Sequence, residues 1–134
     1  MNSRQVEYVV IGGVAAIAYG VPRMTLDLDI LIRPTRDNAE RLLQAFMEAG
    51  LGTAALTSAD DLLAQEITIF KDRVRVDVQT RTPGVTFDAA YARRNTVDVD
   101  GIAVPLVSRG DLIATKRAAG RPRDLEDVRI LEGR

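Results

Sequence analysis

The sequence predicts an α+β fold in a single domain that spans residues 1–134. Apolar segments rich in β-branched residues alternate with segments of helical character, as expected for strands interleaved with helices. The 134 residues and the hydrophobic fraction of 46% suit one domain with a core of its own. There is no internal repeat, low-complexity tract or interdomain linker in the chain.

The first half of the chain reads as two strands and two helices. In order, we expect a strand over 6–11, a helix over 14–19, a strand over 26–32 and a helix over 35–50. The glycine pair at 12–13 breaks the first apolar run, and Thr35 is a typical cap for the second helix. Residues 53–65 show no clear period and are compatible with a short strand and a turn.

The second half begins with a predicted hairpin and ends in helices. In order, we expect strands over 66–70 and 74–80 around the turn Lys71-Asp72-Arg73, a helix over 87–94, two strand-like arms within 96–107, and helices over 108–119 and 125–131. Asp100-Gly101 is a strong hairpin turn signal between the two arms. Residues 108–134 are thus expected to form a C-terminal helical segment.

Composition narrows the chemistry. The chain contains no cysteine and no histidine, which excludes disulfides, thiol nucleophiles, histidine bases and the usual zinc ligands. Any reaction must use carboxylates, lysine, arginine, hydroxyls, backbone groups and a hard metal such as Mg²⁺. The net charge of −1 gives no general affinity for nucleic acid or membranes, so an anionic substrate needs a local basic patch.

The location expected from the sequence is cytoplasmic. Met1 is followed by polar residues and not by the basic and then apolar stretch of a signal segment. No apolar run approaches the roughly 20 residues of a membrane span, so we expect no membrane association.

Asp27 and Asp29 are the most informative residues of the chain. They stand two apart in a strand-like run and therefore share one face, while Leu26, Leu28 and Ile30 point to the other. Two carboxylates side by side on a largely buried strand repel one another and resist desolvation. A bound divalent cation removes both penalties, so the pair predicts a metal site.

Asp77 is the third acid of interest, because it lies in mid-strand between Val76 and Val78. If its strand neighbours the first acidic strand, all three acids converge on one patch. Ligation by carboxylate oxygens alone suits Mg²⁺ or Mn²⁺. The alternative is that the acids face water, with Arg75 or Arg81 as ion-pair partners.

Gly12 and Gly13 join a strand to a helix. Free backbone N–H groups at a helix start make a plausible cradle for phosphate. The alternative is a tight strand-to-helix turn that requires glycine.

Basic residues supply candidate contacts to an anionic substrate. Arg23 precedes the acids and either binds phosphate or pairs with an acid. Lys116 opens a basic segment, 116–123, in which Arg123 is a further candidate, and we favour a role for Lys116 in neutralising phosphate charge. For Arg121 and Arg129 we favour ion pairs within the C-terminal segment.

Three ordered motifs resemble the nucleotidyltransferase superfamily that includes DNA polymerase beta. They are Val10-Ile11-Gly12-Gly13, then Thr25-Leu26-Asp27-Leu28-Asp29, then Val76-Asp77-Val78. With Arg23 and Thr25 ahead of the acids, the variant looks most like small bacterial nucleotidyltransferases of the abortive-infection and toxin–antitoxin type.

The resemblance implies a small mixed sheet backed by helices and a Mg²⁺-dependent transferase. Asp27, Asp29 and Asp77 would hold the metal, and Asp77 would also orient or deprotonate the attacking hydroxyl. Gly12 and Gly13 would approach the phosphates of a nucleoside triphosphate. A nucleoside monophosphate would pass to a hydroxyl of an RNA end, a protein or a small molecule.

Two departures from the superfamily pattern leave other functions open. Position 14 is Val, where many members carry Ser or Thr, and no sizeable second domain follows the motifs. A second copy of the chain or the C-terminal helices would then complete the site, and an antitoxin is a conceivable partner. A catalytically weak nucleotide-binding or regulatory module is the main alternative, and a phosphohydrolase with the same ligands is another.

Overall fold

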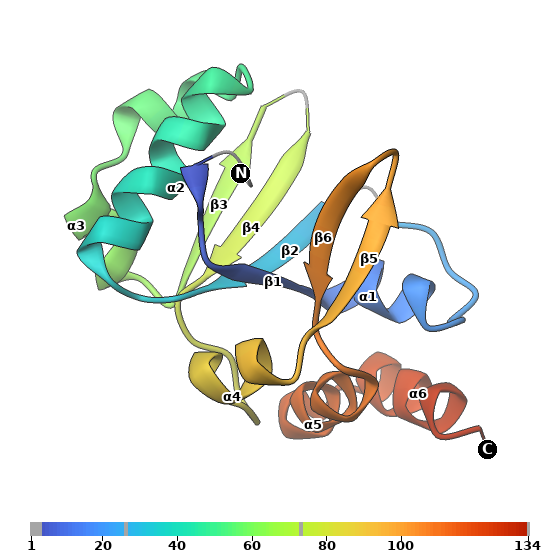
Figure 1. The fold of residues 1–134 in the computed structure, drawn as a ribbon. Helices are drawn as coiled ribbons and strands as arrows, with labels where there is room; N and C mark the ends of the chain where they lie inside the picture. Colours follow the sequence, from blue (N-terminus) through green and yellow to red (C-terminus); the bar gives the residue numbers. More distant parts are fainter. Residues whose placement is uncertain (1–3, 26, 73, 134) are drawn as a thin grey trace.

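The computed structural model describes residues 4–25, 27–72 and 74–133, and these form one sheet with helices around it (Figure 1). The strands are β1 (Tyr8–Ile11), β2 (Asp27–Ile32), β3 (Ile67–Lys71), β4 (Arg75–Gln79), β5 (Asn95–Val99) and β6 (Ile102–Leu106). The helices are α1 (Gly12–Ala18), α2 (Arg36–Glu48), α3 (Ala59–Ala64), α4 (Phe87–Ala92), α5 (Arg109–Ala119) and α6 (Pro122–Leu131), with a 3-10 helix η2 (Gly52–Leu56). The predicted α+β class is confirmed.

The sheet is mixed, with the strand order β3-β4-β2-β1-β6-β5. β2 is antiparallel to β1 and parallel to β4, and β1 is parallel to β6. The hairpins β3–β4 and β5–β6 are antiparallel and form the two ends of the sheet. Because β2 pairs with β4, residues 48 positions apart in the chain, such as Asp29 and Asp77, lie side by side at the centre.

The two faces of the sheet carry different side chains. Phe70 pairs with Val76 across β3 and β4, and the adjacent pair is Ile69 with Asp77. Since successive residues alternate between faces, Phe70 and Asp77 point in opposite directions. The Phe70 ring meets Phe46 of α2 edge to face, with 5.2 Å between centroids. α2 therefore covers the face away from Asp77, while α5 and α6 pack together in another part of the molecule (Figure 1).

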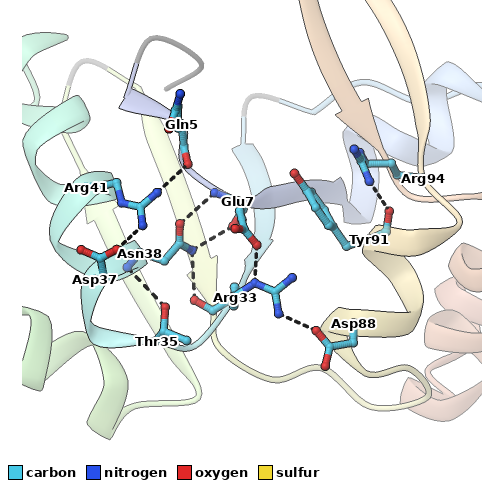
Figure 2. A network of polar contacts seen from close by, with 10 residues as sticks. All are labelled: Gln5, Glu7, Arg33, Thr35, Asp37, Asn38, Arg41, Asp88, Tyr91 and Arg94. Carbon is cyan, nitrogen blue, oxygen red and sulfur yellow. Dashed lines mark hydrogen bonds and ion pairs between the residues drawn. The ribbon is translucent and has the colours of Figure 1, made fainter.

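A polar network ties α2 and α4 to the ends of β1 and β2 (Figure 2). The buried Asn38 side chain accepts a hydrogen bond from the Glu7 N–H and donates to the Glu7 and Arg33 carbonyls. The Arg33 guanidinium binds Glu7 and Asp88 and lies 4.9 Å from the centroid of the Phe87 ring. The network satisfies backbone groups just outside the sheet, which fixes where the helices leave it.

Turn chemistry explains the hairpin between β5 and β6. Asp100 and Gly101 both have positive φ, +52° and +83°. A two-residue hairpin turn of this kind needs φ above zero at both positions, which Asp-Gly tolerates well. The predicted turn is confirmed.

Residues 53–65 contain no strand, contrary to the expectation, and hold η2 and α3 instead. Ser58 begins α3 with a capping box in which its hydroxyl accepts from Asp61 N–H and the Asp61 carboxylate accepts from Ser58 N–H. This reciprocal cap is a helix-start signal, and it prevails over the short apolar stretch before it.

Other boundaries differ at helix ends. α1 begins at Gly12 and not at residue 14, α4 ends at Ala92, and α6 begins at Pro122, three residues before the predicted start. Proline is well suited to the first turn of a helix because its missing N–H costs nothing there. The predicted positions of Leu26 and Arg73 lie outside the described residues. In the described part of the chain, no helix has the length and apolar character needed to cross a membrane.

Candidate functional site

The three acids lie together because β2 and β4 are neighbours in parallel register. Asp29 pairs directly with Asp77, and Asp27 pairs with Arg75. Residues 27, 29, 75 and 77 therefore form a block of four side chains on one face of the sheet. On the other face, Ile30, Val76 and Val78 are buried in the core, which keeps this register from slipping. The predicted convergence of Asp27, Asp29 and Asp77 is what the structure shows.

The surroundings of Asp29 raise the pKa of its carboxyl. Burial, the charge of Asp77, a hydrogen bond with the Asp77 side chain and the charge of Asp27 together raise its pKa to about 6. A hydrogen bond from the Gly13 N–H acts in the opposite direction. A carboxyl whose pKa is raised in this way is ionised at neutral pH at a cost in free energy, and a bound cation would reduce that cost.

Arg75 is the positive member of the block. Its Nε donates to Asp77 Oδ1 at 2.9 Å and its Nη2 donates to Asp77 Oδ2 at 3.2 Å. Its Nε also lies 3.8 Å from Asp27 Oδ2. The ion-pair alternative is thus correct for Arg75, while Arg81 lies 3.7 Å from Glu66.

Gly12 allows the close approach of Asp29. It begins α1 with φ +71°, and a Cβ placed on it would lie 2.3 Å from Asp29 Oδ2. A Cβ on Gly13 would have Thr25 as its nearest neighbour, with Cγ2 at 3.4 Å. The turn therefore requires glycine at position 12 in particular, and the Gly13 N–H is directed at Asp29.

A cavity of about 350 Å³ opens above the acids. The sheet contributes Asp27, Asp29 and Asp77 to its lining, next to the glycine pair, and the β1–β2 connection, α5 and α6 contribute cations and Asp124. The cations are Arg23, Lys116, Arg121 and Arg123. A cavity lined by both acids and cations suits a ligand that carries both a metal ion and phosphates.

Two of these cations are anchored by one buried acid. Asp127 is 0% exposed, and its Oδ1 lies 2.5 Å from Arg23 Nη2 while its Oδ2 lies 2.9 Å from Lys116 Nζ. Lys116 is also buried, with Asp124 Oδ1 at 3.7 Å. Burial raises the pKa of Asp124, but Arg121 and Lys116 outweigh this and hold that pKa below its usual value.

The alternatives left open for Arg23 and Lys116 are partly narrowed by these contacts. Both line the cavity, yet both already pair with Asp127. The Arg23 Nε is buried without a hydrogen-bond partner, and the contact with Asp127 is made through Nη2. Arg121 and Arg129 pair with Asp124 and Glu126, within the C-terminal segment as expected.

Comparison with known proteins places the chain in a family. Residues 1–132 match the model of DUF6036, described as a nucleotidyltransferase of unknown function. The chain belongs to this family. A solved structure with a similar fold is an antigenic nucleotidyltransferase-like protein from Paracoccidioides brasiliensis, with TM-score 0.58 and 16% identity over 97% of this chain and 69% of that one. No curated protein matches the chain.

The DUF6036 chain has ligands that fit a hard divalent cation, although they are not yet arranged around one. Its acids offer only oxygen donors, and Asp29 and Asp77 share a hydrogen bond between carboxyl groups that repel when both are charged. Among the described residues no group of three acids is placed to hold an ion as it stands. Both oxygens of Asp77 accept hydrogen bonds from Arg75 instead.

The sequence did not predict that one buried acid of this nucleotidyltransferase fold anchors two cations of the cavity. It indicated a role for Lys116 but not its ion pair with Asp127, which lies on the following helix. The other partner of Asp127, Arg23 on the β1–β2 connection, is about a hundred residues away. Arg75 had a readable signal, since an arginine two residues before a strand acid shares its face. The Val14 side chain packs against the core and offers no hydroxyl to a ligand.

Proposed function

We propose that the chain transfers a nucleoside monophosphate from a nucleoside triphosphate to a hydroxyl acceptor, using Mg²⁺ or Mn²⁺. The observation that carries the proposal is the cavity lined by the three carboxylates of the sheet and by four cations. A metal-chelated triphosphate matches that combination of charges, since its metal would bind the acids and its phosphates the basic donors. Membership of a nucleotidyltransferase family supports the same reaction class.

The chain's own residues would act by positioning and charge neutralisation. Asp27, Asp29 and Asp77 would hold the metal, which when bound would neutralise phosphate charge and polarise the phosphoryl group. Arg23 and the exposed Arg121 and Arg123 line the same cavity, where their guanidinium groups would donate to phosphate oxygens.

Asp77 is the acid best placed to orient the acceptor. It lies between Asp29 and the edge strand β3, whose Ile69 is its neighbour in register. An acceptor hydroxyl that reaches the cavity over β3 would meet the Asp77 carboxylate first, as general base or hydrogen-bond acceptor. The acceptor we propose is a hydroxyl of an RNA end, a protein side chain or a small molecule.

A catalytically weak nucleotide-binding or regulatory module is the second candidate. It is favoured by the ion pairs that already neutralise charged side chains of the site. Arg75 binds Asp77, and Asp127 binds Lys116 and Arg23. Such a module would bind the metal-chelated nucleotide without turnover.

Labelling separates the candidates. Purified protein with Mg²⁺ would receive each of the four nucleoside triphosphates, labelled at the α-phosphate, with total RNA and cell lysate as acceptors. We expect one acceptor class to become labelled and Asp29→Asn to abolish the label. Asp98→Asn, an exposed strand acid in β5, is the matched control and should label normally.

Other outcomes would decide against transfer. Equal labelling by Asp29→Asn would contradict the proposed site. Nucleotide binding detected by calorimetry, with no acceptor becoming labelled, would favour the weak module. Release of free phosphate, again with no acceptor becoming labelled, would identify a phosphohydrolase.

A further inference from the structure

Arg75 occupies a position that the proposed reaction leaves unexplained. In the four-residue block it lies beside Asp27 across the strands and two residues before Asp77 on the same strand. It binds both oxygens of Asp77 and approaches Asp27 to within 3.8 Å. A permanently charged guanidinium thus lies where two of the three candidate metal ligands meet.

We propose that Arg75 is a resident counter-ion that competes with the divalent cation for Asp77 and Asp27, and that cation binding releases it. The proposal rests on the metal site of the proposed function. It adds that in the metal-free protein Arg75 pairs with these two acids and keeps them from a cation. The affinity for the metal is then set by how firmly Arg75 holds them.

Electrostatics favours competition over cooperation. The three carboxylates repel one another, and Arg75 compensates part of that charge in the metal-free protein. A divalent cation at Asp77 would lie within a few ångströms of the guanidinium, where like charges repel. Both oxygens of Asp77 already accept a hydrogen bond from Arg75, so the carboxylate must turn from one cation towards the other.

The exposure of Arg75 shows that its release is feasible. Its side chain is 38% exposed, against 0% for Asp127 in the buried cluster. An exposed arginine can move into water, which replaces its partners, and the bound cation then compensates the charge of Asp77 in its place. Asp77 itself is only 14% exposed, so the arginine and not the acid is the mobile member.

Direct metal binding tests the proposal without any assay of turnover. Mn²⁺ binding would be measured by electron paramagnetic resonance for the wild type, Arg75→Gln, Arg75→Lys and Asp29→Asn. Arg81→Gln is the matched control, because Arg81 is an exposed arginine of the same region whose partner is Glu66. We expect Arg75→Gln to bind Mn²⁺ roughly two- to tenfold more tightly than wild type.

The companion variants discriminate further. Lysine keeps the charge but not the two-pronged contact, so Arg75→Lys should fall between wild type and Arg75→Gln. In the wild type, the Arg75 Nε–H resonance, assigned by its absence from the glutamine variant, should move on addition of Mg²⁺. Arg81→Gln should leave both readouts unchanged.

Unchanged or weaker Mn²⁺ binding by Arg75→Gln would overturn the proposal, as would an Nε–H resonance that ignores Mg²⁺. If that happens while Asp29→Asn still loses Mn²⁺, the metal site stands and only the competing role of Arg75 fails. If no variant and no wild-type protein binds Mn²⁺, the metal site of the proposed function fails together with it.

Discussion

Two clusters of charge in this protein are built from the same residue types and differ in balance and burial. The acidic block of β2 and β4 sets three carboxylates against one arginine, beside an open cavity. The cluster around Asp127 sets two buried acids, Asp124 and Asp127, against Lys116, Arg23 and Arg121, and Asp127 has no exposure at all. A cluster whose buried acids are all paired holds structure together, whereas a block with more acids than cations is left with charge for a ligand.

The largest effect should come from breaking the buried cluster. Asp127→Ala would leave Lys116 and Arg23 buried without their shared acid, so we expect a loss of about 3–5 kcal/mol in the free energy of unfolding. Denaturation by urea, monitored by circular dichroism, would measure it. Glu126→Gln changes an exposed acid on the same helix and should cost less than about 0.5 kcal/mol. Equal effects would mean that the Asp127 cluster does not anchor α6.

The next largest loss of stability should come from adding a side chain at the turn between β1 and α1. Gly12→Ala would force a Cβ to within 2.3 Å of Asp29 Oδ2 at a φ of +71°. We expect a loss of about 2 kcal/mol in stability, together with weaker Mn²⁺ binding because Asp29 must move. Gly13→Ala is the matched control, since the nearest atom to its Cβ is Thr25 Cγ2, at 3.4 Å. Similar losses for both variants would remove the special role of Gly12.

Removing an acid from the acidic block should stabilise the metal-free protein, whereas the two changes above destabilise it. Because the pKa of Asp29 is raised to about 6 from 3.8, its folded form binds a proton more tightly than its unfolded form. Its contribution to stability is thus present below pH 4 and is lost as the pH rises through 6. Asp29→Asn should stabilise the metal-free protein by about 1 kcal/mol at pH 8, after allowance for solvent screening, and by almost nothing at pH 4.

Thermal unfolding with a chelator present, at both pH values, would test the sign. A variant less stable than wild type at pH 8 would show that Asp29 is a structural acid like Asp127. Such a result would erase the contrast between the two clusters.

The smallest effect belongs to exposed pairs outside both clusters. Arg129 pairs with Glu126 on the surface of α6, at 2.8 Å. Arg129→Gln should change stability by less than about 0.5 kcal/mol and leave nucleotide labelling unaltered. A labelling defect would instead extend the functional surface along α6.

The acidic site was predictable because its geometry follows from the period of a strand. Asp27 and Asp29 share a face in any strand, and the alternation of Val76, Asp77 and Val78 needs no tertiary information. The helix within residues 53–65 was not predicted, because the apolar residues of this segment also suit a strand. Its start depends on the cap formed by Ser58 and Asp61.

The sequence by itself determined the α+β class, the faces on which the three acids lie, and the need for glycine between β1 and α1. These are local consequences of residue type, strand period and allowed backbone angles. Only the tertiary structure decided that β2 and β4 are parallel neighbours, that Arg75 also approaches Asp27, and that Asp127 anchors Arg23 and Lys116. These contacts join different elements of the chain, and many arrangements of the same elements satisfy the same local rules. The choice among them comes from how the whole core packs.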